Sequence, residues 1–183
     1  MSGSGGILPL SGNRNEGPSR ARSGRGLRVS TTQIEDAYEP FAAALRTGGF
    51  GDPDTGWTAG QIGAHIAMNN ELLSQAAETL HETGAASYDN HSAVDDDGLL
   101  AYARQRGDLA GLADAVQASA ARLARAYENL TEEERERPVP ALIVDGGRVV
   151  VDEPMPLGHL IPGNGDFHLG MHLAQLQSLP RQS

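Results

Sequence analysis

Two histidines near the C-terminus, His168 and His172, are the residues whose spacing points most directly to chemistry. Side chains four residues apart on an α-helix project from one face, so both imidazoles of a helical His-x-x-x-His segment reach the same point. Neutral imidazole is a common ligand of divalent transition metals. The pair therefore suggests a metal site, although in a chain with six histidines such a spacing arises by chance about one time in ten.

A third histidine, His65, lies far upstream in a strongly predicted helix whose apolar residues recur at steps of three and four. His65 belongs to this buried face, where an imidazole needs a partner such as a backbone carbonyl or a metal. With the C-terminal pair present, we favour the metal. If the two helices pack side by side, His65, His168 and His172 converge and leave one coordination position open, as in catalytic zinc sites. Zinc is the preferred metal, and nickel, cobalt, copper or iron would also suit these ligands.

Two residues near His65 are candidates for binding a cofactor or substrate. Asn69 lies one helical turn beyond His65, where it could orient a ligand, bind substrate or make a buried polar contact within the bundle. Trp57, the single tryptophan, precedes the same helix and could line a pocket mouth, although packing as a hydrophobic staple is favoured. Surface positions are expected for the other histidines, which are His81, His91 and His159.

The amino-acid composition limits which classes of function are possible. The chain has no cysteine, so any thiol in the reaction must come from outside. A net charge of -10 argues against a nucleic-acid surface. No apolar stretch approaches the roughly 18 residues that a membrane span needs. We therefore expect a soluble, cytoplasmic protein without nucleic-acid or membrane partners.

The chain divides into a leader and one domain. Residues 1–29 are rich in Gly, Ser, Asn and Arg and show no apolar periodicity, which predicts a disordered leader. It could also act as a basic docking arm, but a simple extension is favoured. Residues 30–183 are long enough for a single domain with a substantial core.

Capping signals and periodicity predict the first three main helices. The first begins with a capping box at Thr32–Glu35 and ends near Arg46, with a kink or a later start at Pro40. The second begins with the box Thr58–Gln61 and ends at Gly84. A third runs from Asp108 to about Asn129. Shorter helical segments are expected around Leu99–Ala103 and in the capped turn Thr131–Glu134.

A β-hairpin and a fourth helix complete the domain. β-branched runs at Val139–Val144 and Arg148–Val151 flank Asp145-Gly-Gly, a strong hairpin signal. The segment Pro162–Gly165 is expected to interrupt the chain, after which Asp166 caps a last helix to about Leu179. The fold class is therefore mainly α: a four-helix bundle with a hairpin inserted between helices three and four.

These residues together resemble the DinB/YfiT-like metal-binding bundles, and in particular the N-terminal domain of mycothiol-dependent maleylpyruvate isomerase. The resemblance rests on Gly56-Trp-Thr58 leading into the helix of His65, on the segment Leu130–Pro138, and on His168 and His172 followed by Leu-Ala-Gln-Leu. It implies that His65, His168 and His172 hold the metal and that a low-molecular-weight thiol, such as mycothiol or bacillithiol, takes part. The isomerase pattern has a glutamate where this chain has His168.

Three functions remain open from the sequence. The leading one is a metal-dependent transferase or isomerase that activates an external thiol for attack on an electrophile, so the expected partners are a small thiol and an electrophilic substrate. A metal-dependent hydrolase would need a nearby carboxylate as general base, and no candidate is evident. A bundle that binds metal and small molecules without catalysis is the third. Assembly as a homodimer is compatible with all three.

Overall fold

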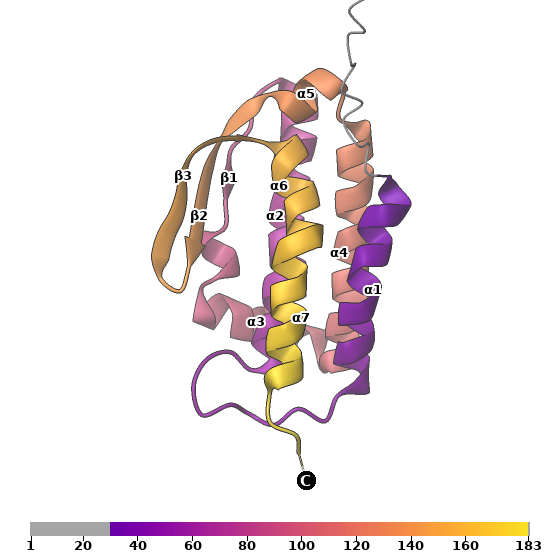
Figure 1. Ribbon diagram of the computed structural model, residues 1–183, viewed down its shortest axis with the longest axis vertical. Coiled ribbons are helices and arrows are strands. Elements are labelled where there is room, and N and C mark those ends of the chain that lie inside the picture. The colour runs from indigo at the N-terminus through magenta and orange to yellow at the C-terminus, as the bar shows by residue number, and fades with distance from the viewer. Residues whose placement is uncertain (1–29, 183) are drawn as a thin grey trace, which may run out of the picture.

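The computed structural model describes residues 30–182, in which long helical segments lie side by side (Figure 1). The leader predicted at residues 1–29 lies outside the described residues. The long segments are α1 (Thr31–Thr47), α2 (Ala59–Thr83), α4 (Leu109–Asn129) and a C-terminal segment formed by α6 (Leu157–Gly163), the π-helical turn η2 (Asn164–His168) and α7 (Leu169–Ser178). The DinB-like four-helix bundle expected from the sequence is therefore confirmed. No described helix is both long and apolar enough to cross a membrane.

The helix starts follow their capping residues. At α2 the predicted box is present, because the Thr58 side chain accepts from the Gln61 backbone N–H and the Gln61 side chain accepts from that of Thr58. At α1 the predicted box was misplaced by two residues: Ser30 and Gln33 make the reciprocal pair, so the helix begins at Thr31. The helix also continues through Pro40 instead of starting after it.

The bundle is held together by a shared apolar core. Helix α4 packs against both α1 and α2, and α7 contacts the same two helices from the other side. The largest fully buried side chains come from all four segments and include Phe41, Leu45, Ile62, Leu73, Leu112, Leu123, Leu157 and Ile161. This packing fixes α2 beside the C-terminal segment, which is the arrangement the three histidines require.

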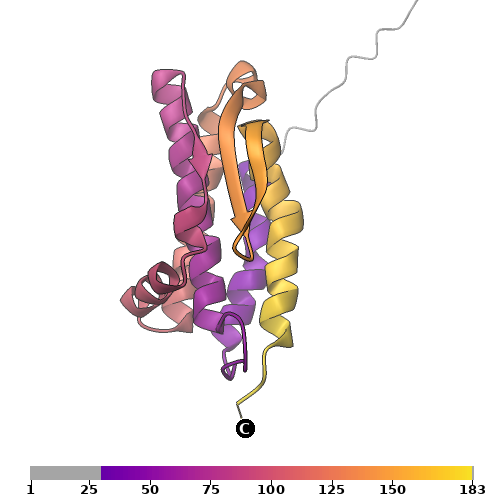
Figure 2. The same cartoon turned by 90° about the vertical axis from the view of Figure 1, so that its left-hand side faces the viewer.

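A small sheet lies against one side of the bundle, across α2 and the C-terminal segment (Figure 2). The predicted hairpin is present as β2 (Pro138–Asp145) and β3 (Arg148–Pro156), joined by a two-residue turn at Gly146 and Gly147. Both glycines have positive φ, 53° and 73°, as a type I′ turn requires. Before the hairpin come α3 (Asp96–Arg106), close to its predicted position, and α5 (Glu132–Glu136).

A third strand was not expected. The two-residue strand β1 (Tyr88–Asp89) pairs in parallel with β2 and leads into the short 3-10 helix η1 (His91–Ala93). Asn90 joins the two segments, because its side chain donates to the Val144 carbonyl and accepts from the Val144 N–H. The hairpin is thereby tied to the loop that leads to Ala93.

The predicted interruption at Pro162–Gly165 is wrong. Helical structure runs from Leu157 to Ser178, and Asp166 lies within the π-helical turn instead of capping a new helix. Buried positions recur at steps of four and three through Leu157, Ile161 and Asn164, and the next residue that the structure describes as buried is Leu169, five positions on. The wider π turn takes up this extra residue, so both halves of the helix bury their apolar faces in one bundle.

Candidate metal centre

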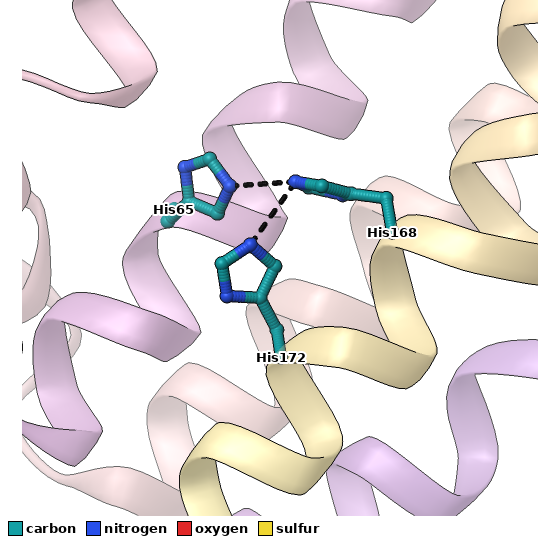
Figure 3. A group of neighbouring side chains, drawn as sticks. All are labelled: His65, His168 and His172. Atoms are coloured by element: carbon teal, nitrogen blue, oxygen red, sulfur yellow. Dashed lines mark hydrogen bonds between the residues drawn. The ribbon is translucent and has the colours of Figure 1, made fainter. Parts of the chain in front are cut away.

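The three predicted histidines converge in the bundle interior (Figure 3). His65 comes from the middle of α2, His168 from the end of η2 and His172 from the first turn of α7. The Nε2 atom of His168 lies 2.9 Å from Nε2 of His65 and 3.1 Å from Nε2 of His172. One candidate ligand atom from each ring falls within 4.8 Å of the others. The predicted convergence is therefore confirmed, while the role of the three rings as metal ligands stays a prediction.

Two of the rings are oriented by partners on their far sides. Nδ1 of His65 donates to the Ala93 carbonyl at 2.5 Å, and Nδ1 of His172 donates to Oε1 of Gln175 at 2.8 Å. Both partners are oxygens that only accept, so the ring proton resides on Nδ1 in each case. Nε2 of each ring consequently presents a lone pair to the centre, as a metal ligand held by an outer hydrogen bond does.

The nitrogen atoms of His168 also indicate that the site suits a cation. Among the buried side-chain nitrogen and oxygen atoms that the structure describes, Nδ1 of His168 has no hydrogen-bond partner. A neutral imidazole carries a single ring proton. On His168 that proton cannot reside on Nδ1 and also be donated from Nε2 to the lone pairs of His65 and His172. A divalent cation bound by the three Nε2 atoms would use every converging lone pair and would place the His168 proton on Nδ1. Three imidazoles are also the protein ligand set of known catalytic zinc sites.

The site keeps its imidazoles neutral. Burial, together with the neighbouring His172, lowers the pKa of His65 to about 4, against the opposing hydrogen bond to the Ala93 carbonyl. Burial and the other two rings lower the pKa of His168 to about 3. The pKa of His172 is also lowered, chiefly by burial. All three rings are thus unprotonated at neutral pH, the state in which imidazole binds a metal.

Trp57 lies against the histidine cluster. Its ring is tilted over His65 with centroids 4.9 Å apart and stacks on His172 at 6.1 Å. The indole Nε1 donates to Oδ1 of Asp96 at 2.8 Å, which fixes the ring from the α3 side. The half-buried tryptophan therefore packs against the core and on the histidine cluster, while its roles as a hydrophobic staple and in cofactor binding stay predictions.

Asn69 takes part in a buried polar network. Its Oδ1 accepts from the Tyr88 hydroxyl at 2.5 Å, and its Nδ2 donates to Oδ1 of Asn164 at 2.7 Å. Asn164 in turn donates to the Tyr38 hydroxyl and to Oδ1 of Asn70. Of the alternatives left open for Asn69, the buried polar contact is the one present, and its assignment as a cofactor-binding residue stays a prediction.

The remaining histidines lie on the surface as expected. His81 is near Glu134 and His91 near Asp89, while His159 is exposed on α6. None of them belongs to the cluster formed by the described residues.

Sequence reasoning missed three groups around the centre. The Ala93 carbonyl has no signal in the sequence, because a backbone atom carries none. Gln175 did have one, since a residue three positions after His172 lies on the same helix face. Asp145, at the end of β2, was interpreted only as a turn residue, yet its negative charge acts to raise the pKa of both His65 and His172. Asp145 itself is exposed, and among the described residues no hydrogen bond joins it to the three histidines.

The chain also shows a family relationship. The sequence profile described as mycothiol maleylpyruvate isomerase N-terminal domain matches residues 32–150. This range is more than half of the chain and includes His65, whereas His168 and His172 lie beyond its end. Searches of curated proteins and of solved structures returned no match. The chain belongs to the mycothiol maleylpyruvate isomerase N-terminal domain family, a family of DinB-like domains.

Proposed function

We propose that the protein is a metal-dependent, most simply zinc-dependent, transferase or isomerase that activates an external low-molecular-weight thiol such as mycothiol. The observation that carries the proposal is the convergence of three neutral Nε2 atoms from His65, His168 and His172. Family membership supports the thiol, and the absence of cysteine means that the chain itself supplies none. The partners are a small thiol and an electrophile, and the cytoplasm is the compartment that keeps such thiols reduced.

The chain's own residues orient the ligands and exclude water. Ala93 and Gln175 hold two rings in the tautomer that presents Nε2, and Trp57 covers one side of the cluster. When bound there, a divalent metal supplies Lewis acidity that lowers the pKa of a thiol and so provides the thiolate nucleophile. The thiol gives up its proton and forms a sulfur–carbon bond with the electrophile, which breaks a π bond or the bond to a leaving group, and the electron pair released there takes up the proton. A transferase keeps that bond in the product, whereas an isomerase breaks it again and releases the thiol unchanged.

The test uses cobalt in place of zinc. Adding a low-molecular-weight thiol to the cobalt-substituted protein is expected to produce sulfur-to-metal charge-transfer absorption, stronger as the pH rises toward the thiol pKa. Turnover with an electrophile is expected to disappear in His65→Ala and to persist in the control His81→Ala, which changes an exposed histidine of the same helix. If mycothiol and related thiols give neither absorption nor turnover while the metal stays bound, the proposal fails.

A metal-dependent hydrolase is the second candidate, and Asp145 is the observation that favours it. Its charge acts on two of the three rings, and a general base would in addition have to come within hydrogen-bond reach of the attacking water. Ester hydrolysis without thiol, lost in Asp145→Asn with metal content unchanged, would support this function. If the protein binds metal but catalyses neither reaction, non-catalytic binding of small molecules becomes the better description.

A further inference from the structure

A cavity of about 250 Å³ adjoins the metal centre, with His168 as part of its wall. It lies between α2, the hairpin and the segment formed by α6 and η2, in the region where the sheet crosses the bundle (Figure 2). Its apolar wall is formed by four side chains from these elements, which are Leu73, Ile143, Met155 and Leu160. The volume falls below the roughly 300–1,000 Å³ of pockets that hold drug-sized ligands, so a small group fits here.

Apart from His159 and His168, the polar side chains that line this cavity already have partners inside the protein. Asn90 makes both of its bonds to Val144. The Tyr88 hydroxyl donates to Asn69, and Asn69 donates to Asn164. A ligand rich in hydroxyl groups would therefore bury donors and acceptors with few partners, which costs free energy.

The cavity is also uncharged. Although the chain carries a net charge of -10, the described residues that line the cavity include no Asp, Glu, Lys or Arg. The exposed His159 is its only titratable lining residue besides His168 and Tyr88 among the residues described. An ionic ligand would meet no compensating charge from the lining side chains.

We propose that this cavity receives an uncharged, largely apolar part of the electrophilic substrate and not the thiol. The assignment rests on the proposed function, because it supposes both a thiol and an electrophile. A polyol-bearing thiol such as mycothiol is a poor match for a small cavity whose polar side chains, apart from His159 and His168, are already paired. An apolar group seated beside His168 places its reactive end next to the site where the thiol is activated.

The first experiment compares two probes on the zinc-loaded protein without thiol. Benzyl alcohol represents a small apolar group, and myo-inositol represents a polyol. By ligand-detected NMR, benzyl alcohol is expected to bind and myo-inositol to bind at least about tenfold more weakly. Equal or tighter binding of myo-inositol would overturn the assignment.

Two variants on strand β3 locate the binding site. Met155→Glu places a carboxylate in the cavity wall and is expected to weaken benzyl alcohol binding about tenfold or more. Val150→Glu makes the same change at a residue that is 56% exposed outside the cavity, and is expected to leave binding unchanged. If Met155→Glu does not fold, Ile143→Phe fills the same cavity with an apolar ring and should exclude the probe. A cavity variant that binds the probe normally would contradict the proposal.

Thiol absorption in the cobalt protein separates this inference from the proposed function. The cavity variants are expected to keep the charge-transfer band, because the thiol lies elsewhere, while the KM for an apolar electrophile rises. Loss of the band in Met155→Glu with metal retained would place the thiol in the cavity and overturn the assignment alone. Absence of the band in the unmodified protein would refute the proposed function, and with it the assignment to an electrophile, whichever probe binds.

Discussion

Gln175 is the side chain on which the orientation of His172 depends. It lies three residues after His172 on α7, and its Oε1 accepts the ring proton at 2.8 Å. Outer hydrogen bonds of this kind fix the tautomer of a ligating imidazole and raise its basicity. The neighbouring Gln177 is exposed on the same helix and serves as a matched control.

Replacing Gln175 should weaken metal binding without unfolding the protein. In Gln175→Ala the His172 ring loses its orienting partner, so zinc affinity is expected to fall about 10–100-fold. Gln177→Ala should bind zinc like the unmodified protein. Competition with a chromophoric chelator measures both affinities, and equal values for the two variants would show that the hydrogen bond does not tune the site.

The histidines themselves make the simplest prediction at this scale. The purified protein is expected to carry about one divalent metal per chain, and alanine at His65, His168 or His172 should remove it, because two remaining imidazoles hold a divalent ion far more weakly. His81→Ala is the control. Elemental analysis measures the metal content of each variant, and metal retained in all three would contradict the assignment of a metal centre.

At the scale of elements, the π-helical turn η2 depends on Asn164. This buried side chain bonds to Asn69 and Asn70 on α2 and to Tyr38 on α1, one helical turn before His168. Buried networks of this kind hold one arrangement of the backbone when every member is satisfied. The turn that carries His168 is thereby fastened to two other helices of the bundle.

The variant Asn164→Leu tests whether these hydrogen bonds hold the π-helical turn in place. The change keeps the approximate size of the side chain but leaves buried polar partners unsatisfied, so the free energy of unfolding should fall by about 1–3 kcal/mol. Zinc affinity should fall as well, because His168 loses its anchored turn. Asn129→Leu, at the exposed end of α4, should change stability by less than about 0.5 kcal/mol. Urea denaturation and chelator competition measure the two effects, and unchanged zinc affinity would show that other contacts hold His168.

The sequence predicted those elements whose signals are local. The cap at Thr58, the αL glycine at Gly84 and the Asp145-Gly-Gly turn act over a few residues, and the structure shows all three. Strand β1 was not predicted because two residues carry no periodic pattern and its partner in β2 is more than fifty residues away in the sequence. The continuous last helix was not predicted because Pro162 and the two glycines that follow it disfavour a helix locally. The burial of Leu157 and Ile161 and the hydrogen bonds of Asn164 stabilise the helix instead.

The same distinction holds for the site. Helical spacing predicted which rings could meet, since His168 and His172 share a face and His65 lies on a buried one. The Ala93 carbonyl and the cavity beneath the sheet could not be predicted, because both depend on how the hairpin packs on the bundle. Long-range packing of this kind leaves no signal in the spacing of residues.

For the molecule as a whole, the leader at residues 1–29 separates in composition from the domain. It carries five arginines and one glutamate and lacks an apolar face, so it offers little surface for burial. Deleting residues 1–28 is expected to leave the melting temperature and the metal content nearly unchanged. Calorimetry and elemental analysis check this, and a drop of several degrees would show that the leader contributes to the folded domain.

The position of the single tryptophan gives the protein an optical reporter of its own. Because Trp57 lies against His65 and stacks on His172, its emission originates within a few ångströms of the histidine cluster. Paramagnetic ions such as Co²⁺ or Ni²⁺ should quench this fluorescence as they bind, and Zn²⁺ should restore it by displacement. Occupancy of the centre can thus be followed in real time on unlabelled protein, without a second tryptophan to dilute the signal.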